Sequence, residues 1–251
     1  MSGLQFRFAD MISEVTALEG MAKPFLEPTS VRVLPPLRII LGNLQDVRRS
    51  GGVRWGISSS DPLITSVSQG AYQPDSAGAH AVFAEISFAW EIRRINPAGK
   101  KTERAEFFEL IGLASTKVRL FRRETNGEKG PLEAMWRMEI GDVHSPGCHF
   151  HVQVMGETDE RPFPKSIDVP RLPGILATPA AAVEFVLAEL FQDEWAEHAA
   201  ATSPHLSRWI PIQKRRLSAV LKWQSGVVQG SGGSPWTTLK RAKPDAKLFV
   251  E

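Results

Sequence analysis

Alternation of apolar and polar side chains over consecutive segments is the feature that most limits what this chain can fold into. In the clearest segment, apolar residues occupy every second position from Val82 to Ile92, and Glu85, Ser87 and Glu91 lie between them. Successive side chains of a β-strand point to opposite faces of the sheet. Residues 81–95 are therefore predicted to form a strand with one core face and one face of ionisable groups.

Three further strands are predicted downstream, joined by short connections. The segment 105–115 continues outward through 117–123, and Gly112 indicates a bulge or bend between the two parts. Asn126-Gly127 is a strong signal for a hairpin turn. The segments 132–140 and 148–154 then alternate like the first strand. Four consecutive strands with short connections predict an antiparallel meander.

Residues 142–147 are predicted to close the last hairpin of this meander. The register that follows pairs Glu139 with His149 and Arg137 with His151. Cross-strand neighbours on one face have Cβ atoms about 5 Å apart. The polar face is thus predicted to hold two imidazoles, a carboxylate and a guanidinium in one patch.

Helical spacing of apolar residues predicts helices on either side of the strands in the sequence. Residues 4–18 predict an N-terminal helix ending at Gly20, and 37–47 predict a second one, although 37–41 could equally be a buried strand. The stretch 51–79 is rich in Gly, Ser, Asp and Pro, so we expect little regular structure there apart from a short strand near 63–67.

Two helices are predicted after the strands. Thr178 followed by Pro179 is a typical helix start, and apolar residues at helical spacing continue from there to Trp195. We expect this helix to lie on the apolar face of the meander. A last helix is predicted over 206–228, with its start disturbed by Pro211.

Together these elements predict an α+β fold. It consists of an antiparallel β-meander of four or more strands, with helices packed on one face and a basic helical appendage at the C-terminus. The predicted domains are an α+β main domain over 1–200, a helical appendage over 201–229 and a flexible basic tail over 230–251. We find no internal repeat.

Composition limits the class of protein. A chain of 251 residues with 42% hydrophobic residues can bury one substantial core without disulfides or metals. The single cysteine, Cys148, cannot form an intramolecular disulfide, and no apolar run approaches the ~18 residues of a membrane helix. No secretory signal is recognisable at the N-terminus. We therefore expect a cytoplasmic protein without a membrane role.

Charge is unevenly distributed along the chain. The whole chain has a formal net charge of +2, but residues 205–251 contain nine Lys or Arg and two acidic residues, a net charge of +7. The preceding residues therefore carry −5, so a basic C-terminal region follows a mildly acidic body.

The predicted polar patch suggests two kinds of chemistry. The patch of His149, His151, Arg137 and Glu139 could do general acid–base work on a phosphodiester, with a His removing a proton and Arg137 stabilising developing phosphate charge. Such a set is typical of a metal-independent ribonuclease. The alternative interpretation, at least as well supported, is a covered or solvated sheet face on which these groups pair across the strands. Spacing fixes no third metal ligand beside His-x-His, so no metal site is predicted.

Two other groups of residues are predicted to bind a ligand or partner. Arg171 lies between prolines in a stiff segment, where it is positioned for a carboxylate or phosphate, although a structural role, in which it caps a carbonyl or pairs with an acidic side chain of the following helix, is slightly favoured. The basic C-terminal region combines cations with tryptophans, a pattern that suits nucleic acid or an acidic partner; the alternative is a helix packed on the body. The predicted binding residues there are Arg208, Lys214, Arg215, Arg216, Trp223, Lys240 and Arg241.

Part of the chain resembles a known family. Trp136 to Glu139, then His149-Phe150-His151, a proline-containing crossing and the helix after Thr178 are similar to the core of small bacterial TumE-like toxins, presumed RNases of toxin–antitoxin pairs. The resemblance covers residues 132–195. It implies a role for Arg137, His149 and His151 only, and this chain departs from the family in its larger N-terminal half and its basic tail.

Two functions therefore remain in view at this point. The favoured one is an interaction subunit of a bacterial cytosolic multiprotein assembly, related to defence or to toxin–antitoxin systems, that binds a protein partner or nucleic acid through its basic C-terminus. The alternative is the ribonuclease described above. No glycine-rich phosphate loop, nucleophile elbow or zinc motif is present, so no cofactor is expected.

Overall fold

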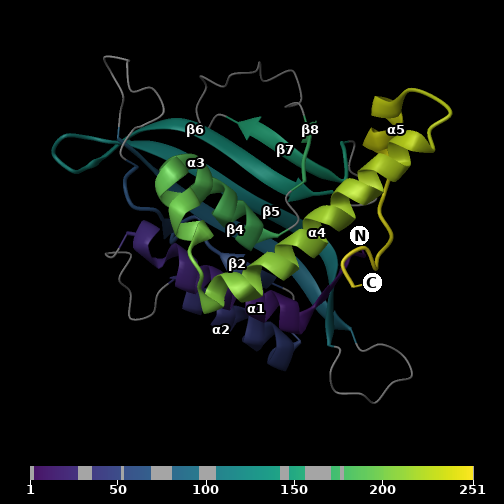
Figure 1. The fold of residues 1–251 in the computed structure, drawn as a ribbon, viewed down its shortest axis with the longest axis horizontal. Helices are drawn as coiled ribbons and strands as arrows, with labels where there is room; N and C mark the ends of the chain where they lie inside the picture. Colours follow the sequence, from purple (N-terminus) through teal and green to yellow (C-terminus); the bar gives the residue numbers. More distant parts are fainter. Residues whose placement is uncertain are drawn as a thin grey trace.

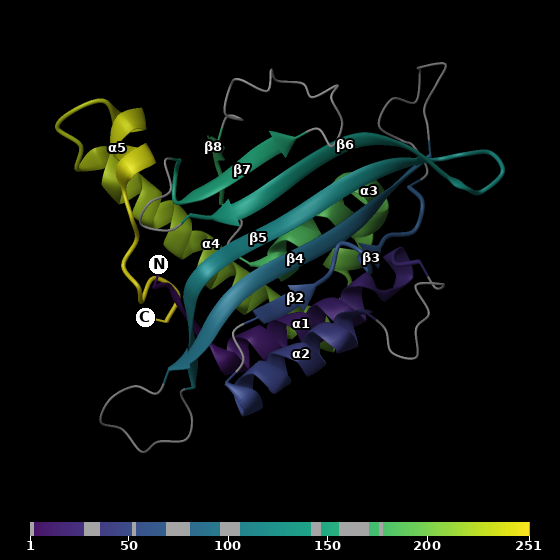
Figure 2. The same ribbon diagram turned by 180° about the vertical axis from the view of Figure 1, so that it is seen from behind.

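The chain forms a long twisted antiparallel sheet with a layer of helices on one of its faces (Figure 1). The computed structural model describes residues 3–27, 36–51, 54–68, 81–95, 106–141, 147–155, 171–175 and 178–250. Within these ranges the helices lie in front of the sheet in Figure 1, and the sheet lies in front of the helices in Figure 2. The predicted α+β fold with an antiparallel sheet is confirmed.

The central path of the sheet follows the sequence order of its main strands. Its order is β2-β4-β5-β6-β7-β8, every neighbouring pair is antiparallel, and β1 and β3 pair with β5 and β4. The bounds are β1 Gln5–Arg7, β2 Arg54–Ile57, β3 Leu63–Ile64, β4 Val82–Ile95, β5 Phe107–Arg123, β6 Lys129–Ile140, β7 Phe150–Met155 and β8 Arg171–Pro173. The predicted meander is the run from β4 to β7.

The predicted bulge at Gly112 is confirmed. Trp90 pairs with Ala114 and Ile92 with Leu110, so three residues of β5 lie opposite the single Glu91 of β4. The Glu91 carboxylate accepts a hydrogen bond from the Leu113 backbone N–H at 3.3 Å. A Cβ atom at residue 112 would lie 1.9 Å from Glu91 Oε2, so only glycine leaves room for this carboxylate.

The predicted register of the last hairpin is wrong by two residues. Ile140 pairs with Phe150, Glu139 with His151 and Arg137 with Gln153. Since side chains alternate with a period of two, this shift keeps His151 and Gln153 on the predicted face and changes only their partners, whereas His149 precedes β7 and contacts the ring of Trp223. The backbone N–H of Gly141 donates to the His149 carbonyl at 2.6 Å, which continues the same observed register by one residue toward the turn.

The N-terminal segment differs from the predicted single helix. Phe6 is buried on a short strand, β1, and Leu4 is buried just before it, because β1 pairs with the first residues of β5. Helix α1 (Phe8–Ala22) begins only after this strand. Residues 36–50 form helix α2 (Pro36–Ser50), so of the two alternatives for 37–41 the helix is the observed one.

Helix α3 (Pro179–Ala200) begins where the sequence predicts. The Thr178 hydroxyl accepts from the Ala181 backbone N–H at 3.2 Å, and Pro179 occupies the first helical turn. Apolar residues of the predicted stripe are buried against the sheet, among them Val183, Leu187 and Trp195. The backbone of Gln192 leaves helical geometry with a φ of 37°, which kinks the helix near its middle.

Helix α4 (Pro204–Gln229) runs continuously through Pro211 and starts two residues earlier than predicted. Ser203 caps it by accepting from the Leu206 backbone N–H at 3.1 Å. The helix packs along α1 and places Leu206, Trp209 and Val220 in the same core as the sheet. The Gln224 side chain donates to the Gly174 carbonyl at 2.9 Å, which ties α4 to the edge of the sheet.

The segment predicted to be a flexible basic tail carries helix α5 (Pro235–Arg241) and then returns to the core. Phe249 is 2% exposed and stacks on Phe6 of β1, with ring centroids 5.1 Å apart. The Gln5 backbone N–H donates to the Ala246 carbonyl at 2.7 Å. The two ends of the described chain therefore lie together, as Figure 1 shows.

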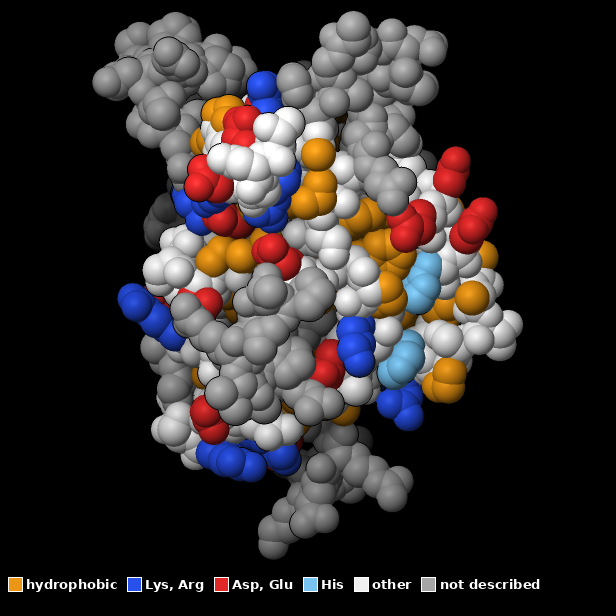
Figure 3. Space-filling model, turned by 90° about the vertical axis from the view of Figure 1, so that its left-hand side faces the viewer, with side chains coloured by type: hydrophobic (Ala, Val, Ile, Leu, Met, Phe, Trp, Pro, Cys, Tyr) orange, Lys and Arg blue, Asp and Glu red, His pale blue; other side chains and the backbone are white. Residues whose placement is uncertain are grey.

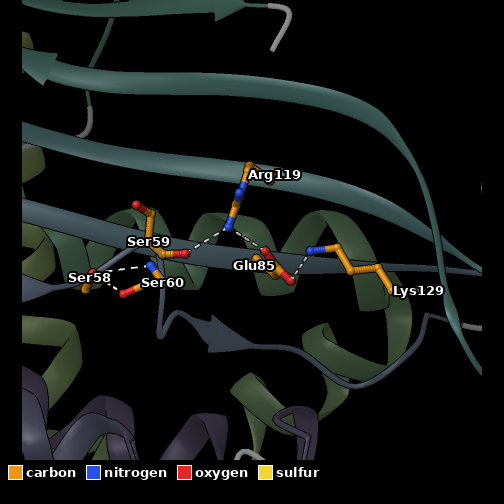
Figure 4. A network of polar contacts seen from close by, with 6 residues as sticks. All are labelled: Ser58, Ser59, Ser60, Glu85, Arg119 and Lys129. Carbon is orange, nitrogen blue, oxygen red and sulfur yellow. Dashed lines mark hydrogen bonds and ion pairs between the residues drawn. The ribbon is translucent and has the colours of Figure 1, made fainter. Parts of the chain in front are cut away.

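The face of the sheet turned away from the helices carries ionic networks. Glu85 of β4 is buried and contacts Arg119 Nη2 and Lys129 Nζ, each at 2.6 Å (Figure 4). The same Arg119 nitrogen donates to the Ser59 carbonyl at 3.0 Å. One carboxylate thus connects β4, β5 and β6 with the turn after β2, which explains how an acidic side chain is accommodated at a buried position.

Candidate functional site

The predicted polar patch exists in part, on β6 and β7. Glu139 Oε2 lies 3.2 Å from His151 Nε2, and Glu139 Oε1 lies 3.5 Å from Arg137 Nη1. Arg137 Nη2 donates to Gln153 Oε1 at 3.0 Å. The structure therefore brings His151, Glu139 and Arg137 together, in a chain of contacts along which each group orients the next.

His151 is held on both sides of its ring. Its Nδ1 atom lies 2.8 Å from the Cys148 carbonyl oxygen, and its Nε2 atom faces the Glu139 carboxylate. A carbonyl and a carboxylate only accept hydrogen bonds, so a ring protonated on both nitrogens satisfies both contacts. A general base needs a ring nitrogen that can reach a substrate proton, and both nitrogens of this 3% exposed residue are engaged within the protein.

The carboxyl group of Glu139 is held in its charged form. Burial works against ionisation, but the hydrogen bond with His151 and the charge of Arg137 outweigh it, so the pKa of Glu139 is lowered from its ordinary value. The group therefore acts as an ion-pair partner at neutral pH.

Cys148 and His149 directly precede β7 and lie outside the contact between Glu139 and His151. The His149 ring contacts the Trp223 ring of α4, with centroids 6.4 Å apart, and the Phe150 ring at 5.1 Å. Cys148 is buried, and this burial raises the pKa of its thiol. The observed register gives Glu139 the partner His151 in place of the expected His149.

The predicted binding residues are dispersed over the surface and the interior. Arg171 lies on β8 opposite Gln153, which separates it from Arg137 by one strand. Arg208, Lys214, Lys240 and Arg241 are exposed on α4 and α5. Arg215 pairs with Asp10 of α1.

Arg216 and Trp223 face the interior instead. Arg216 is 3% exposed and forms an ion pair with Glu14 of α1, and its guanidinium lies 5.7 Å from the centre of the Phe6 ring. Trp223 is half-buried against Phe150, with ring centroids 5.7 Å apart. For these two residues the structure matches the packed-helix alternative.

A cavity of about 260 Å³ opens between α3 and α4. We call it, together with its rim, the α3–α4 groove. Its walls are mostly apolar, and a few polar groups converge on it, an arrangement that is typical of ligand pockets. The lining residues are Ile175, Thr178, Ala181, Glu184, Phe185, Ala188, Trp195, Gln213, Arg216 and Leu217.

The floor of the groove rests on a buried polar network around Glu14. Glu14 is 1% exposed. Its Oε1 atom accepts from the Thr178 hydroxyl at 2.7 Å and from the Gln213 amide at 2.6 Å, and its Oε2 atom pairs with Arg216. The network joins α1, the cap of α3 and α4, so it fixes the positions of the two helices that form the groove.

Glu184 is the second carboxyl group at the groove. Burial raises the pKa of Glu184 from its ordinary value, against a hydrogen bond with the Trp209 indole, and the negative charge of Glu14 raises it further. A carboxyl group with a raised pKa that lines a cavity is a candidate functional group.

An exposed apolar stripe on α4 borders the groove. Ile210, Leu217, Leu221 and Val228 are between 39% and 47% exposed. Their spacing of seven, four and seven residues places them on one face of the helix. Leu217 also lines the cavity, across from Phe185 of α3, which is 42% exposed. The stripe and the groove therefore form one continuous apolar surface.

Charge is distributed unequally on the two sides of this surface. Several exposed residues of α3 are acidic, and several exposed residues of α4 are basic. Figure 3, which views the molecule from the left-hand side of Figure 1, shows acidic and hydrophobic side chains next to each other on the side of the helices. The acidic residues are Glu189, Asp193, Glu194 and Glu197, and the basic ones are Arg208, Lys214 and Lys222.

Comparisons with family models, with curated proteins and with solved structures found no match. In the ranges that the structure describes, no helix is both long and apolar enough to cross a membrane. The same ranges contain no group of three or more His, Cys, Asp or Glu side chains suited to a metal ion. The TumE-like resemblance stays a prediction.

The groove was not predicted from the sequence. Glu14 was expected on the polar side of an N-terminal helix, and Gln213 and Glu184 gave no motif. One signal was available: Arg216 lies seven residues after Trp209 and four before Val220, on the buried face of α4. A charge at such a position needs a buried partner, and an acidic residue inside an otherwise apolar helix was the natural candidate.

Proposed function

We propose that this chain is an interaction subunit that binds one amphipathic helix of a protein partner in the α3–α4 groove. The observation that carries the proposal is the exposed apolar stripe of α4 running beside an open cavity. Contiguous apolar surface with a polar rim is typical of protein interaction sites, and helix-in-groove binding uses apolar anchors at this spacing.

Charge supports a partner of defined character. Lys214, three residues before Leu217, is exposed on α4 next to the stripe, and exposed acidic residues lie on α3 across the groove. A partner helix with an apolar face, acidic residues toward α4 and basic residues toward α3 would match both sides. Complementary charges of this kind fix the orientation of the partner and raise its association rate more than its affinity.

The setting that we infer for this subunit is a bacterial cytosolic multiprotein assembly. The proposed role needs no catalytic group, and the polar patch supports it because His151, Glu139 and Arg137 are engaged with one another. A ribonuclease is not proposed, since no observation favours a His151 nitrogen that is available to substrate.

Co-purification of tagged variants from the native host tests the proposal. Leu217→Glu and Phe185→Glu place a charge on the apolar rim, where the partner would have to desolvate it. We expect both variants to lose the same co-purifying protein. Ser218→Glu is the matched control, because Ser218 is exposed on the same helix outside the stripe. Retention of that protein by both rim variants, at unchanged thermal stability, would refute the proposal.

A further inference from the structure

Acidic groups outnumber basic groups at the α3–α4 groove. Glu14 and Glu184 contribute two carboxyl groups, and Arg216 contributes one guanidinium. The guanidinium pairs with Glu14 beneath the floor, where Thr178 and Gln213 complete the contacts of that carboxylate. Glu184 therefore remains as a carboxyl group at the cavity without a cation of its own among the groups that line it.

The surroundings of Glu184 make it selective for a cation. The neighbours on its own helix are Ala181, Phe185 and Ala188, and the facing residues of α4 are Gln213, Arg216 and Leu217. Trp209 supplies one hydrogen bond to it. In these partly apolar surroundings an opposite charge interacts more strongly than it does in water, and an ionised Glu184, with Arg216 already paired with Glu14, favours a cation over an anion.

We propose that the cavity binds the ammonium group of an alkylamine, and that its source is a lysine side chain of the docked partner helix. Lysine combines a compact charge with an unbranched apolar stem. Ile175, Phe185, Leu217 and Trp195 would enclose the stem, and the Glu184 carboxylate would receive the ammonium group. This identification of the occupant rests on the proposed function, since it names the residue that the partner inserts.

Binding of an ammonium group is linked to the protonation of Glu184. The neutral carboxyl group that burial favours must release its proton to pair with the cation, so binding strengthens as pH rises through the raised pKa of Glu184. The charges that face Glu184 are those of Glu14 on α1 and Arg216 on α4, which form an ion pair with each other.

The test uses n-butylamine as the probe, which reproduces the lysine stem without any partner protein. Titration of the isotope-labelled full chain, followed by amide chemical shifts, should perturb residues of α3 and α4 around the cavity. We expect n-butanol and butyrate, which have the same stem, to bind at least about tenfold more weakly than the amine. Affinity for the amine should increase between about pH 5 and pH 8, since an alkylamine stays charged in this range.

Two variants separate the role of Glu184 from general attraction to an acidic surface. Glu184→Gln should weaken amine binding at least about tenfold and remove its pH dependence. Glu189→Gln removes an exposed charge from the same helix and should leave binding unchanged. The inference is overturned if butyrate or butanol binds as well as the amine, if Glu184→Gln binds it normally, or if the shifts map elsewhere.

The experiments distinguish failure of the cation site from failure of the proposed function. A partner that docks in the groove while the amine does not bind would overturn the cation site alone. An amine that binds by these criteria, in a protein whose rim variants keep all partners, would overturn the lysine as its source.

Discussion

At the scale of single residues, buried charges determine both the stability and the chemistry of the helix layer. Glu14 and Arg216 are among the least exposed residues of the described chain, and each would be an isolated charge in the core without the other. Removing one partner of such a pair is far more destabilising than replacing both, because it leaves an uncompensated buried charge.

Arg216→Met is therefore expected to lower the free energy of unfolding by about 3–5 kcal/mol. The double variant Glu14→Gln with Arg216→Met should recover a large part of this loss, since no charge then remains unpaired. Denaturant unfolding of the two variants and the parent measures both values. Equal stability of the single and double variants would show that the pair does not have the buried character described.

The two carboxyl groups with shifted pKa values predict opposite dependences on pH. The folded-state pKa of Glu184 is raised above the ordinary value of 4.5, so Glu184 makes stability depend on pH only above that value. As pH rises through the folded pKa, the unfolded chain releases the proton more readily and stability falls. Glu184→Gln should therefore equal the parent near pH 4 and exceed it in thermal stability at pH 7, as measured by calorimetric scans across this range.

Glu139 follows the opposite sign. Its folded-state pKa is lowered, so the stability from its pairs with His151 and Arg137 is present above the unfolded pKa and is lost as pH falls through the folded pKa. Glu139→Gln should be less stable than the parent at pH 7 by about 1–3 kcal/mol, with the gap closing in acid. A constant gap from pH 7 to about pH 3 would contradict the assigned ion pairs.

At the scale of elements, the sequence predicted long segments well and short ones poorly. Strands β4 to β7 and helices α3 and α4 were expected because each carries a long periodic pattern of its own. The short strands β1, β2 and β8 have only three or four residues, and the pairing of their edges with neighbours distant in sequence defines them. Pattern analysis has no access to such pairing.

The error in the β6–β7 register has the same origin. Alternation fixes which face a side chain occupies, but a shift of two residues leaves that pattern unchanged. The turn geometry fixes the remaining choice, and the turn sequence did not reveal it. The predicted patch therefore had the right face and the wrong pairs.

Paired cysteines test the observed register. In a Cys148→Ala background, Arg137→Cys with Gln153→Cys should form a disulfide on mild oxidation, because the two residues are cross-strand partners. Arg137→Cys with His151→Cys, the pair expected from the sequence, should remain reduced. Mass measurement of the intact protein with and without reductant distinguishes the two, and the reverse result would restore the original register.

The C-terminal segment is an element of the core and not only a carrier of positive charge. Phe249 contacts the rings of Phe6 and Phe150, which belong to strands far apart in the sequence. Phe249 lies in a run of only three apolar residues at the end of a polar tail, which gave too weak a signal to predict this contact.

Phe249→Ala is expected to lower the free energy of unfolding by about 3–5 kcal/mol, as aromatic truncations in packed cores do. Trp236→Ala is the matched control, because Trp236 is 74% exposed on α5. Its change should stay within about 0.5 kcal/mol. Similar small effects for both variants in denaturant unfolding would mean that the tail does not anchor on the core.

At the scale of the whole molecule, the two faces of the sheet have different roles. The apolar face organises α1, α3 and α4 around a buried ion-pair network, and the divergence of α3 and α4 leaves the groove open. The opposite face is stabilised by ion pairs such as Glu85 with Arg119 and Lys129. Among the described residues, the helix side combines exposed apolar surface, a cavity and a carboxyl group with a raised pKa.

The sequence drew attention to the β6–β7 face, whereas the groove proposed as the binding site lies on the helix side, and this difference has a physical reason. In a sequence, histidines and arginines in a short alternating strand resemble a catalytic set whether or not neighbouring side chains already engage their hydrogen-bonding atoms. The groove, in contrast, arises from α1, α3 and α4 meeting in space, with Glu14 and Arg216 about 200 residues apart along the chain.

Site-specific photo-crosslinking in the native host tests the central claim, that the α3–α4 groove binds a protein partner, most directly. A photoreactive residue at position 217 or 185 should capture one and the same protein. The same residue at Asn126, an exposed turn on the sheet, should not capture it. Capture at all three positions alike, or at none of the groove positions, would contradict the account.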